Sequence, residues 1–112
     1  MRKVPRVRPL SENVIETRDR IRAGELTAAA AAEEALRQVE AVNPQIDATT
    51  DILREEALRQ ASEIDRRLEA GEDPGPLAGV PFTVKSNICT LEGRTSAASR
   101  IIENHVSPYE AT

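Results

Sequence analysis

Apolar residues recur every three or four positions over much of the first seventy residues, which is the spacing of one face of an α-helix. The first such segment predicts a helix that begins at Ser11, a residue with a capping oxygen, and ends at Ala23. Val14 and Ile21 lie on its apolar face. Gly24 follows at a position where a left-handed residue commonly stops a helix.

A second segment predicts a longer helix that begins with Thr27 as its cap and ends near Val42. Asn43 precedes Pro44, and a residue before proline avoids the helical region, so we expect the helix to end there. The apolar positions of this helix are Ala32, Leu36 and Val39.

A third segment predicts a helix from about Asp51 to Ala70, with Gly71 after it. Its apolar stripe contains Leu53, Ala57, Ala61, Ile64 and Leu68. The stripe has two interpretations, because an apolar helix face either packs in the core of its own domain or binds a partner.

The pattern changes after Gly71. Residues 72–76 are rich in proline and glycine and predict a linker. Residues 80–84 are mostly apolar and predict a short strand that begins near Pro81, because proline is confined to strand starts, edges and bulges. Loop residues then lead to a short helical segment over 96–102.

Composition limits the size of any core. Phe82 and Tyr109 are the only aromatic residues among the 112, so the core must be built from small aliphatic side chains and alanine. The net charge is −4, and basic residues cluster only in residues 1–8. That cluster is interpreted either as a nucleic-acid arm or targeting signal, or as part of a flexible, solvated N-terminus over residues 1–10. An acidic domain is a poor nucleic-acid binder on its own.

Residue counts exclude two kinds of site. Cys89 is the single cysteine and cannot form an internal disulfide, and with the single histidine, His105, it cannot build a common zinc site. No apolar stretch is long enough to cross a bilayer, and the N-terminus lacks the apolar centre of a secretory signal. We therefore expect a cytoplasmic protein with no metal or cofactor bound to this chain and no membrane contact.

Lys85 is the candidate catalytic residue. It stands at the end of the predicted strand and is followed by Ser86 and Asn87. Spacing alone allows two interpretations, which are a solvated lysine at a strand end and a partly desolvated amine whose lowered pKa makes it a general base. No nearby serine stands in a G-x-S-x-G context, and no serine–histidine–acid triad can be assembled with His105 as the only histidine.

Residues 76–90, PLAGVPFTVKSNICT, resemble the lysine-bearing segment of amidase-signature enzymes, in which the pattern P-L-x-G-[VI]-P-x-x-[VI]-K-D-N is common. Residues 94–104, RTSAASRIIEN, and 108–112, PYEAT, are similar to the corresponding run in the A subunits of glutamyl-tRNA amidotransferases. The helical region agrees mainly in organisation. The chain is thus identified as a member of the amidase-signature family, most like the N-terminal part of such an A subunit.

The resemblance implies an α/β fold. Residues 11–71 would form an N-terminal helical layer, and residues 72–112 would begin the amidase-signature core with the first strand or strands of a mixed sheet. The resemblance also assigns Lys85 as the ultimate base for two serines, one of them in a cis peptide arrangement. An acyl-enzyme would form as ammonia leaves a carboxamide.

The resemblance further implies partners. In these amidotransferases glutamine or asparagine donates the amide, and the ammonia passes to a B subunit. That subunit uses ATP and magnesium to amidate mischarged aminoacyl-tRNA such as Glu-tRNA(Gln), and a small C subunit helps to hold A and B together. The A subunit would therefore meet tRNA only through the complex, and would bind no cofactor itself.

The sequence departs from the family pattern in two ways. The segment that supplies both serines is absent, and residues 109–112 resemble the opening of a helix, so we expect an incomplete core and an inactive isolated chain. Ser86 also stands where aspartate is most common. A carboxylate there would favour the charged lysine, whereas a hydroxyl supplies only hydrogen bonds.

Two other functions remain open. One is a general amidase that hydrolyses small carboxamides and needs no tRNA system. The other is a non-catalytic helical module that binds a partner through the stripe over residues 53–68. The second predicts a chain that folds cooperatively by itself.

Overall fold

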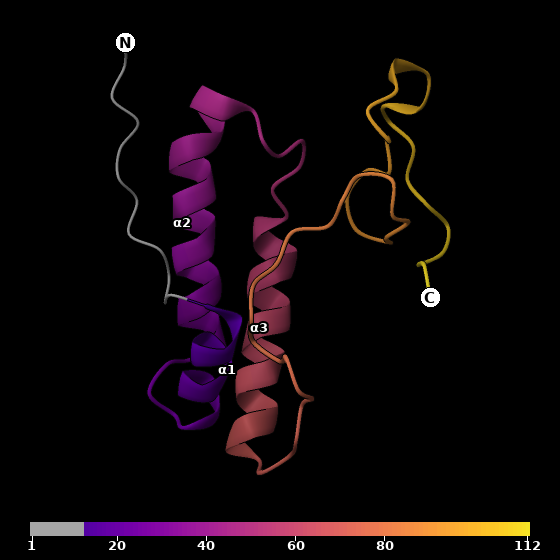
Figure 1. Cartoon of the computed structure of the whole chain (residues 1–112). Helices are drawn as coiled ribbons and strands as arrows, with labels where there is room; N and C mark the ends of the chain where they lie inside the picture. The colour runs from indigo at the N-terminus through magenta and orange to yellow at the C-terminus, as the bar shows by residue number, and fades with distance from the viewer. Residues whose placement is uncertain (1–12) are drawn as a thin grey trace.

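The computed structural model describes residues 13–112, and within that range it is helical and irregular, with no assigned strand. The elements in chain order are α1 (Val14–Arg22), α2 (Ala28–Ile46), α3 (Arg54–Glu69) and the 3-10 helix η1 (Arg100–Ile102). Figure 1 shows α2 and α3 side by side as an antiparallel hairpin, with α1 near the start of α2. The predictions for residues 1–10 and for a cap at Ser11 fall outside the described residues.

Helix α1 has its cap at Asn13, later than the sequence predicted. The side-chain oxygen of Asn13 accepts a hydrogen bond from the N–H of Glu16 at 2.9 Å. Ile21 is 3% exposed and belongs to the core, whereas Val14 is 51% exposed. The predicted apolar face is therefore correct at its C-terminal end only.

Helix α2 does not end before Pro44, and that prediction was wrong. It continues to Ile46, with Pro44 inside its last turn, where the missing N–H costs a single intrahelical hydrogen bond. Asn43 stabilises this end of the helix, because its side chain donates to the carbonyl of Thr49 at 3.0 Å and accepts from the N–H of Thr49 at 2.8 Å. Asp47, with φ of 53°, closes the helix in the left-handed region.

The hairpin packs through alanine. Ala28, Ala32 and Ala61 form the buried cluster, and Leu58 and Ile64 pack against it. Small side chains let two helix backbones approach closely, and the sequence prediction of a core of small residues is confirmed. Since Ala61 and Ile64 belong to the stripe of α3, part of that stripe is core.

Polar contacts fasten both ends of the hairpin. Near the end of α3, the Asp65 carboxylate accepts hydrogen bonds from the free N–H groups of Ala28 at 2.7 Å and Ala29 at 3.0 Å, at the start of α2. At the other end, Arg54 at the start of α3 donates to Glu40 at 2.8 Å and to Glu33 at 3.1 Å. These contacts join positions far apart in sequence and fix the register of the two helices.

The chain after α3 returns along the hairpin and packs against α1 and α2. Gly79 adopts φ of +87°, and a Cβ there would lie 2.9 Å from Cδ1 of Ile21 and 3.0 Å from Cβ of Ala28. Both the positive φ and the lack of space for a Cβ require glycine at this position. Arg22 also donates to the carbonyl of Gly75 at 3.0 Å, which joins α1 to the same segment.

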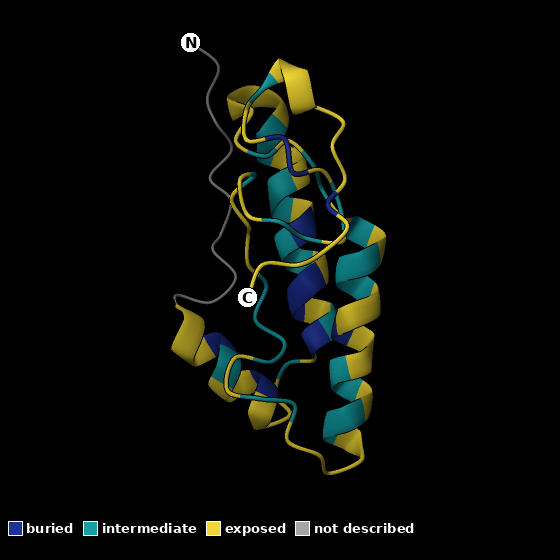
Figure 2. Cartoon of the chain, turned by 90° about the vertical axis from the view of Figure 1, so that its right-hand side faces the viewer, coloured by how far each residue is buried: buried dark blue, intermediate teal, exposed yellow. Residues whose placement is uncertain are grey.

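Residues 82–112 form what we call the C-terminal lobe, which stands beside the hairpin (Figure 1) and is mostly exposed or half-buried (Figure 2). The strand expected over 80–84 is not assigned, because a strand requires a hydrogen-bonded neighbour and no described segment pairs with it. The sheet part of the expected α/β fold is therefore not confirmed. The radius of gyration is 15.6 Å, against about 13 Å for a compact domain of similar size.

The helical segment expected over 96–102 is reduced to η1. Ala97 and Ala98 have φ of 48° and 58°, which no right-handed helix accepts. Only the three residues of Arg100–Ile102 then turn helically.

Candidate functional site

Lys85 ends an extended segment and begins a turn. Its carbonyl oxygen accepts a hydrogen bond from the N–H of Ile88 at 3.0 Å, which closes a turn over residues 85–88. The side chain is exposed, and within residues 13–112 it has no hydrogen-bond or ion-pair partner. The amine is therefore free to meet a group that is not among the described residues.

Lys85 and Ser86 line an open groove of about 880 Å³ between the hairpin and residues 77–94. This volume falls within the range of small-molecule sites. The apolar side chains along the groove include Leu36, Val39, Ile64, Leu77 and Val84. The lysine thus sits where an apolar wall contributed by two helices meets the loop that follows the extended segment.

The desolvation expected of a general-base lysine is not present in the described part of the chain. The groove is open, and Lys85 and its neighbours Phe82 and Val84 are exposed, with Phe82 at 82%. A water-poor surrounding for the Lys85 amine would have to come from further protein atoms.

Ser86 is half-buried, and its backbone joins the lysine turn to the rest of the lobe. The carbonyl of Ser86 accepts a hydrogen bond from the N–H of Ala97 at 3.0 Å. Ala97 is the first of the two left-handed alanines, a conformation that costs a non-glycine residue about 1 kcal/mol or more. Nearby, the hydroxyl of Thr95 is buried without a hydrogen-bond partner among the described residues.

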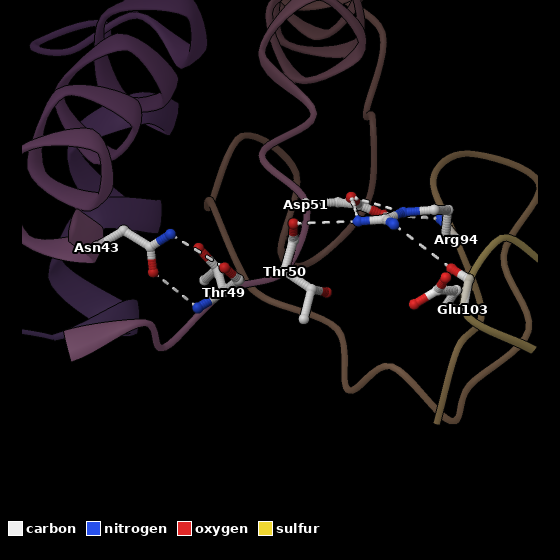
Figure 3. A network of polar contacts seen from close by, with 6 residues as sticks. All are labelled: Asn43, Thr49, Thr50, Asp51, Arg94 and Glu103. Atoms are coloured by element: carbon white, nitrogen blue, oxygen red, sulfur yellow. Dashed lines mark hydrogen bonds and ion pairs between the residues drawn. The ribbon is translucent and has the colours of Figure 1, made fainter. Parts of the chain in front are cut away.

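Arg94 forms the densest polar network of the lobe (Figure 3). Its guanidinium donates to the Asp51 carboxylate at 2.7 Å from Nη2 and 3.1 Å from Nε, and its backbone N–H donates to the same carboxylate at 2.9 Å. The other Nη reaches the carbonyl of Glu103 at 3.4 Å. The hydrogen bond from Arg94 lowers the pKa of Asp51 below its usual range.

Sequence reasoning did not single out Asp51 and Arg94 as a pair. They lie 43 positions apart, and neither has a local pattern that marks it as functional. In the sequence Arg94 stands out only as part of the family resemblance over 94–104. Only the folded chain shows that its side chain returns to the connection between α2 and α3.

The other chemically active side chains do not form a site with Lys85. His105 is exposed, and its backbone bonds to Ile102 and Thr95. Cys89 is half-buried, and a hydrogen bond between it and Tyr109 raises the pKa of the tyrosine.

Residues 13–112 contain no group of three or more histidine, cysteine or acidic side chains arranged to hold a metal ion. In the same range no helix has both the length and the apolar character that a bilayer crossing requires.

Comparisons with known proteins agree with the resemblance seen in the sequence. The A subunit of glutamyl-tRNA(Gln) amidotransferase from Carboxydothermus hydrogenoformans is 43% identical over 97 residues, which are 87% of this chain and 20% of that protein. The protein of the same name from Symbiobacterium thermophilum is 44% identical over 91 residues, or 80% of this chain and 19% of its own. The chain thus spans about a fifth of the length of these curated relatives.

A solved structure has a similar backbone fold over most of this chain. It comes from work on a vestigial protein complex and the evolutionary origins of an s-triazine catabolic enzyme, and it matches with a TM-score of 0.78 at 34% identity. The match covers 82% of this chain and 20% of that chain. In addition, a family model described as Amidase matches residues 30–112. The chain belongs to the Amidase family.

Proposed function

We propose that this chain is the N-terminal part of the A subunit of a glutamyl-tRNA(Gln) amidotransferase, the component that hydrolyses glutamine to supply ammonia. The observation that carries the proposal is the 43% identity to such an A subunit over 87% of the chain, including the segment with Lys85. Lys85 lines the groove and is the only lysine among the described residues that do so.

In the proposed mechanism Lys85 is the final acceptor of a proton. Two serines from further protein would lie between its amine and the substrate carboxamide. The nucleophilic serine would pass its proton through the bridging serine to a neutral Lys85 Nζ as its oxygen attacks the amide carbon. The same proton route, reversed, would deliver that proton to the amide nitrogen as the C–N bond breaks, so that ammonia leaves and an acyl-enzyme remains. Because residues 1–112 do not include such a serine-rich segment, we expect the chain alone to be inactive.

The proposal extends to partners. A B subunit would use ATP and magnesium ions to activate Glu-tRNA(Gln) and capture the ammonia, and a C subunit would stabilise the pair. The chain would then meet tRNA only through the complex, and the reaction would take place in the cytoplasm. Glutamine or asparagine would be the amide donor.

A general amidase is the second candidate. It is favoured by the solved neighbour, which comes from work on the evolutionary origins of an enzyme that breaks down an s-triazine, a small molecule. The two candidates share the chemistry at Lys85 and differ in the partner, so dependence on B and C subunits separates them.

The test is a chimera in which this chain replaces the matching fifth of the A subunit from C. hydrogenoformans, coexpressed with B and C subunits. We expect glutamine hydrolysis, and we expect Lys85→Ala to lower kcat by about 10²- to 10⁴-fold, the usual contribution of a general base. Lys85→Arg keeps the charge but cannot accept a proton, so it should be equally inactive. Ser86→Asp restores the residue that is most common in the family at this position and should retain activity. Turnover by Lys85→Ala at the parental rate would refute the role of the lysine.

A further inference from the structure

Arg94 is the polar connection between the two parts of the described chain. From the C-terminal lobe it donates hydrogen bonds to residues between α2 and α3, namely to the Asp51 carboxylate and to the carbonyl of Thr50. Other bonds of the lobe are internal, such as those of Ser86 with Ala97 and of Thr95 with His105. We call the Asp51–Arg94 contact the clasp.

The geometry of the clasp suits a rigid joint. A guanidinium and a carboxylate form a forked pair with two parallel hydrogen bonds, which fixes angle as well as distance. The backbone N–H of Arg94 also donates to the Asp51 carboxylate, with 2.9 Å between nitrogen and oxygen, and this bond holds the main chain of the lobe in place. Next to it, Gly93 lies against Leu53, where a Cβ would come within 3.2 Å of the leucine side chain. The side chains of Arg94 and Asp51 are 41% and 26% exposed, so the pair is partly shielded from water.

A short path leads from the clasp to Lys85. Arg94 is followed by Thr95, whose N–H donates to His105 at 2.8 Å, and Ala97 then donates to the carbonyl of Ser86 at 3.0 Å. Ser86 is the residue next to Lys85. Ala97 and Ala98, which lie on this path, have left-handed backbone conformations. Such conformations are high in energy for alanine and persist only where surrounding contacts hold them.

We propose that Asp51 and Arg94 are positioning residues, and that the clasp sets the orientation of Lys85 by holding the lobe against the hairpin across the groove. The part of this proposal that concerns the lysine rests on the proposed function. The part that concerns the joint between hairpin and lobe stands on the geometry alone. The experiment therefore has one arm for each part.

The first arm measures the joint in the 112-residue chain. Spin labels are placed at Ser62→Cys on α3 and at Ile101→Cys, which is 95% exposed in the lobe, in a Cys89→Ser background. Double electron–electron resonance should give a narrow distance distribution for the parent. Asp51→Asn and Arg94→Ala should broaden it, and Arg94→Lys should broaden it too, because an ammonium lacks the fork. Arg66→Ala is the matched control, since Arg66 pairs with Glu63 within α3. A parental distribution in Arg94→Ala would overturn the proposal.

The second arm measures the consequence for chemistry in the chimera. A lysine displaced by about 1 Å should lower kcat about 10²-fold. The KM for glutamine should change less, because Asp51 and Arg94 line the groove with their polar groups already bonded to each other. A variant that only weakened the fold would lower the amount of active enzyme, which active-site titration reports, and leave kcat per active site unchanged. That result would overturn the positioning role. If the parental chimera does not hydrolyse glutamine, the proposed function fails, and the spin-label distances alone decide the joint.

Discussion

The α2–α3 hairpin and the C-terminal lobe are both exposed on much of their surface, yet they are held in place differently. In the hairpin, two regular helices share a buried alanine cluster and are fastened at both ends by Asp65 and Arg54. The lobe has one three-residue helix and exposed apolar side chains, and Arg94 bonds it to the connection between the helices. The hairpin is held by regular helix hydrogen bonds, a packed alanine cluster and polar contacts at both ends, whereas the lobe depends on a few specific contacts.

This difference corresponds to a division of roles. A helical layer with continuous backbone hydrogen bonds provides a stable wall, and the groove lies along it. The candidate catalytic lysine lies on the irregular side of the groove, as is common for functional residues carried by loops on a rigid scaffold. Substitutions in the hairpin should therefore alter the free energy of unfolding. Substitutions in the lobe should alter the position of Lys85 relative to the helices.

The largest expected effect is in the hairpin. Ala32 is 7% exposed within the alanine cluster, so Ala32→Leu should overpack the interface and lower the free energy of unfolding by about 1–3 kcal/mol. The exposed Ala30 on the same helix provides the control, because Ala30→Leu adds the same atoms at an open position. Urea titrations followed by circular dichroism measure both. Equal stability of the two variants would show that the helices do not pack as closely as the structure indicates.

A smaller difference is expected between two glycine variants, one of them where the returning chain crosses the hairpin. Gly79→Ala and Gly71→Ala both place a side chain at a positive φ, +87° and +76°, which costs about 1 kcal/mol in each. Only at Gly79 would the new Cβ meet Ile21 and Ala28, so the difference in unfolding free energy between the two variants should reach about 1–2 kcal/mol. Comparable losses in the same titration would contradict the close approach.

The smallest expected effect is the loss of the Asp51–Arg94 clasp at low pH. Arg94 lowers the pKa of Asp51 in the folded chain, so the clasp contributes stability above the ordinary pKa of 3.8 and loses it as pH falls through the lowered value. The spin-label distance distribution should therefore stay narrow at pH 3.8 and broaden only as pH falls through the lowered pKa of Asp51. Asp51→Asn cannot ionise and should show a broad distribution that this titration does not change. If the parental distances stay narrow once the carboxylate is protonated, ionisation of Asp51 does not hold the clasp.

Much of the hairpin could be predicted from the sequence, because helix formation depends on neighbours three and four positions away. The predicted ends of α2 and of the 96–102 segment were wrong for related reasons. Pro44 was interpreted by its local preference, but the Asn43–Thr49 contacts compensate for it. Ala97 and Ala98 have helix-forming side chains, yet the contact of Ala97 with Ser86 places them in a left-handed turn. In each case a hydrogen bond formed in the folded chain overrides a local preference.

The candidate site divides in the same way. Lys85 could be found in advance because the motif around it is contiguous and resembles a known family, and its catalytic role stays a prediction. The sequence left open whether its amine is solvated or desolvated, because burial depends on which atoms surround a residue in space. The clasp had no signal in the sequence, since Asp51 and Arg94 are ordinary charged residues until the fold brings them together.

The sequence by itself determined three helices, a core of small side chains and the family of the chain, because helical period, residue volume and a contiguous motif are all local properties. The tertiary structure alone decided how the lysine-bearing lobe meets the helices, which glycine must stay a glycine and which arginine joins the two parts. Those features depend on atoms that are distant along the chain, and only folding sets the distances between them.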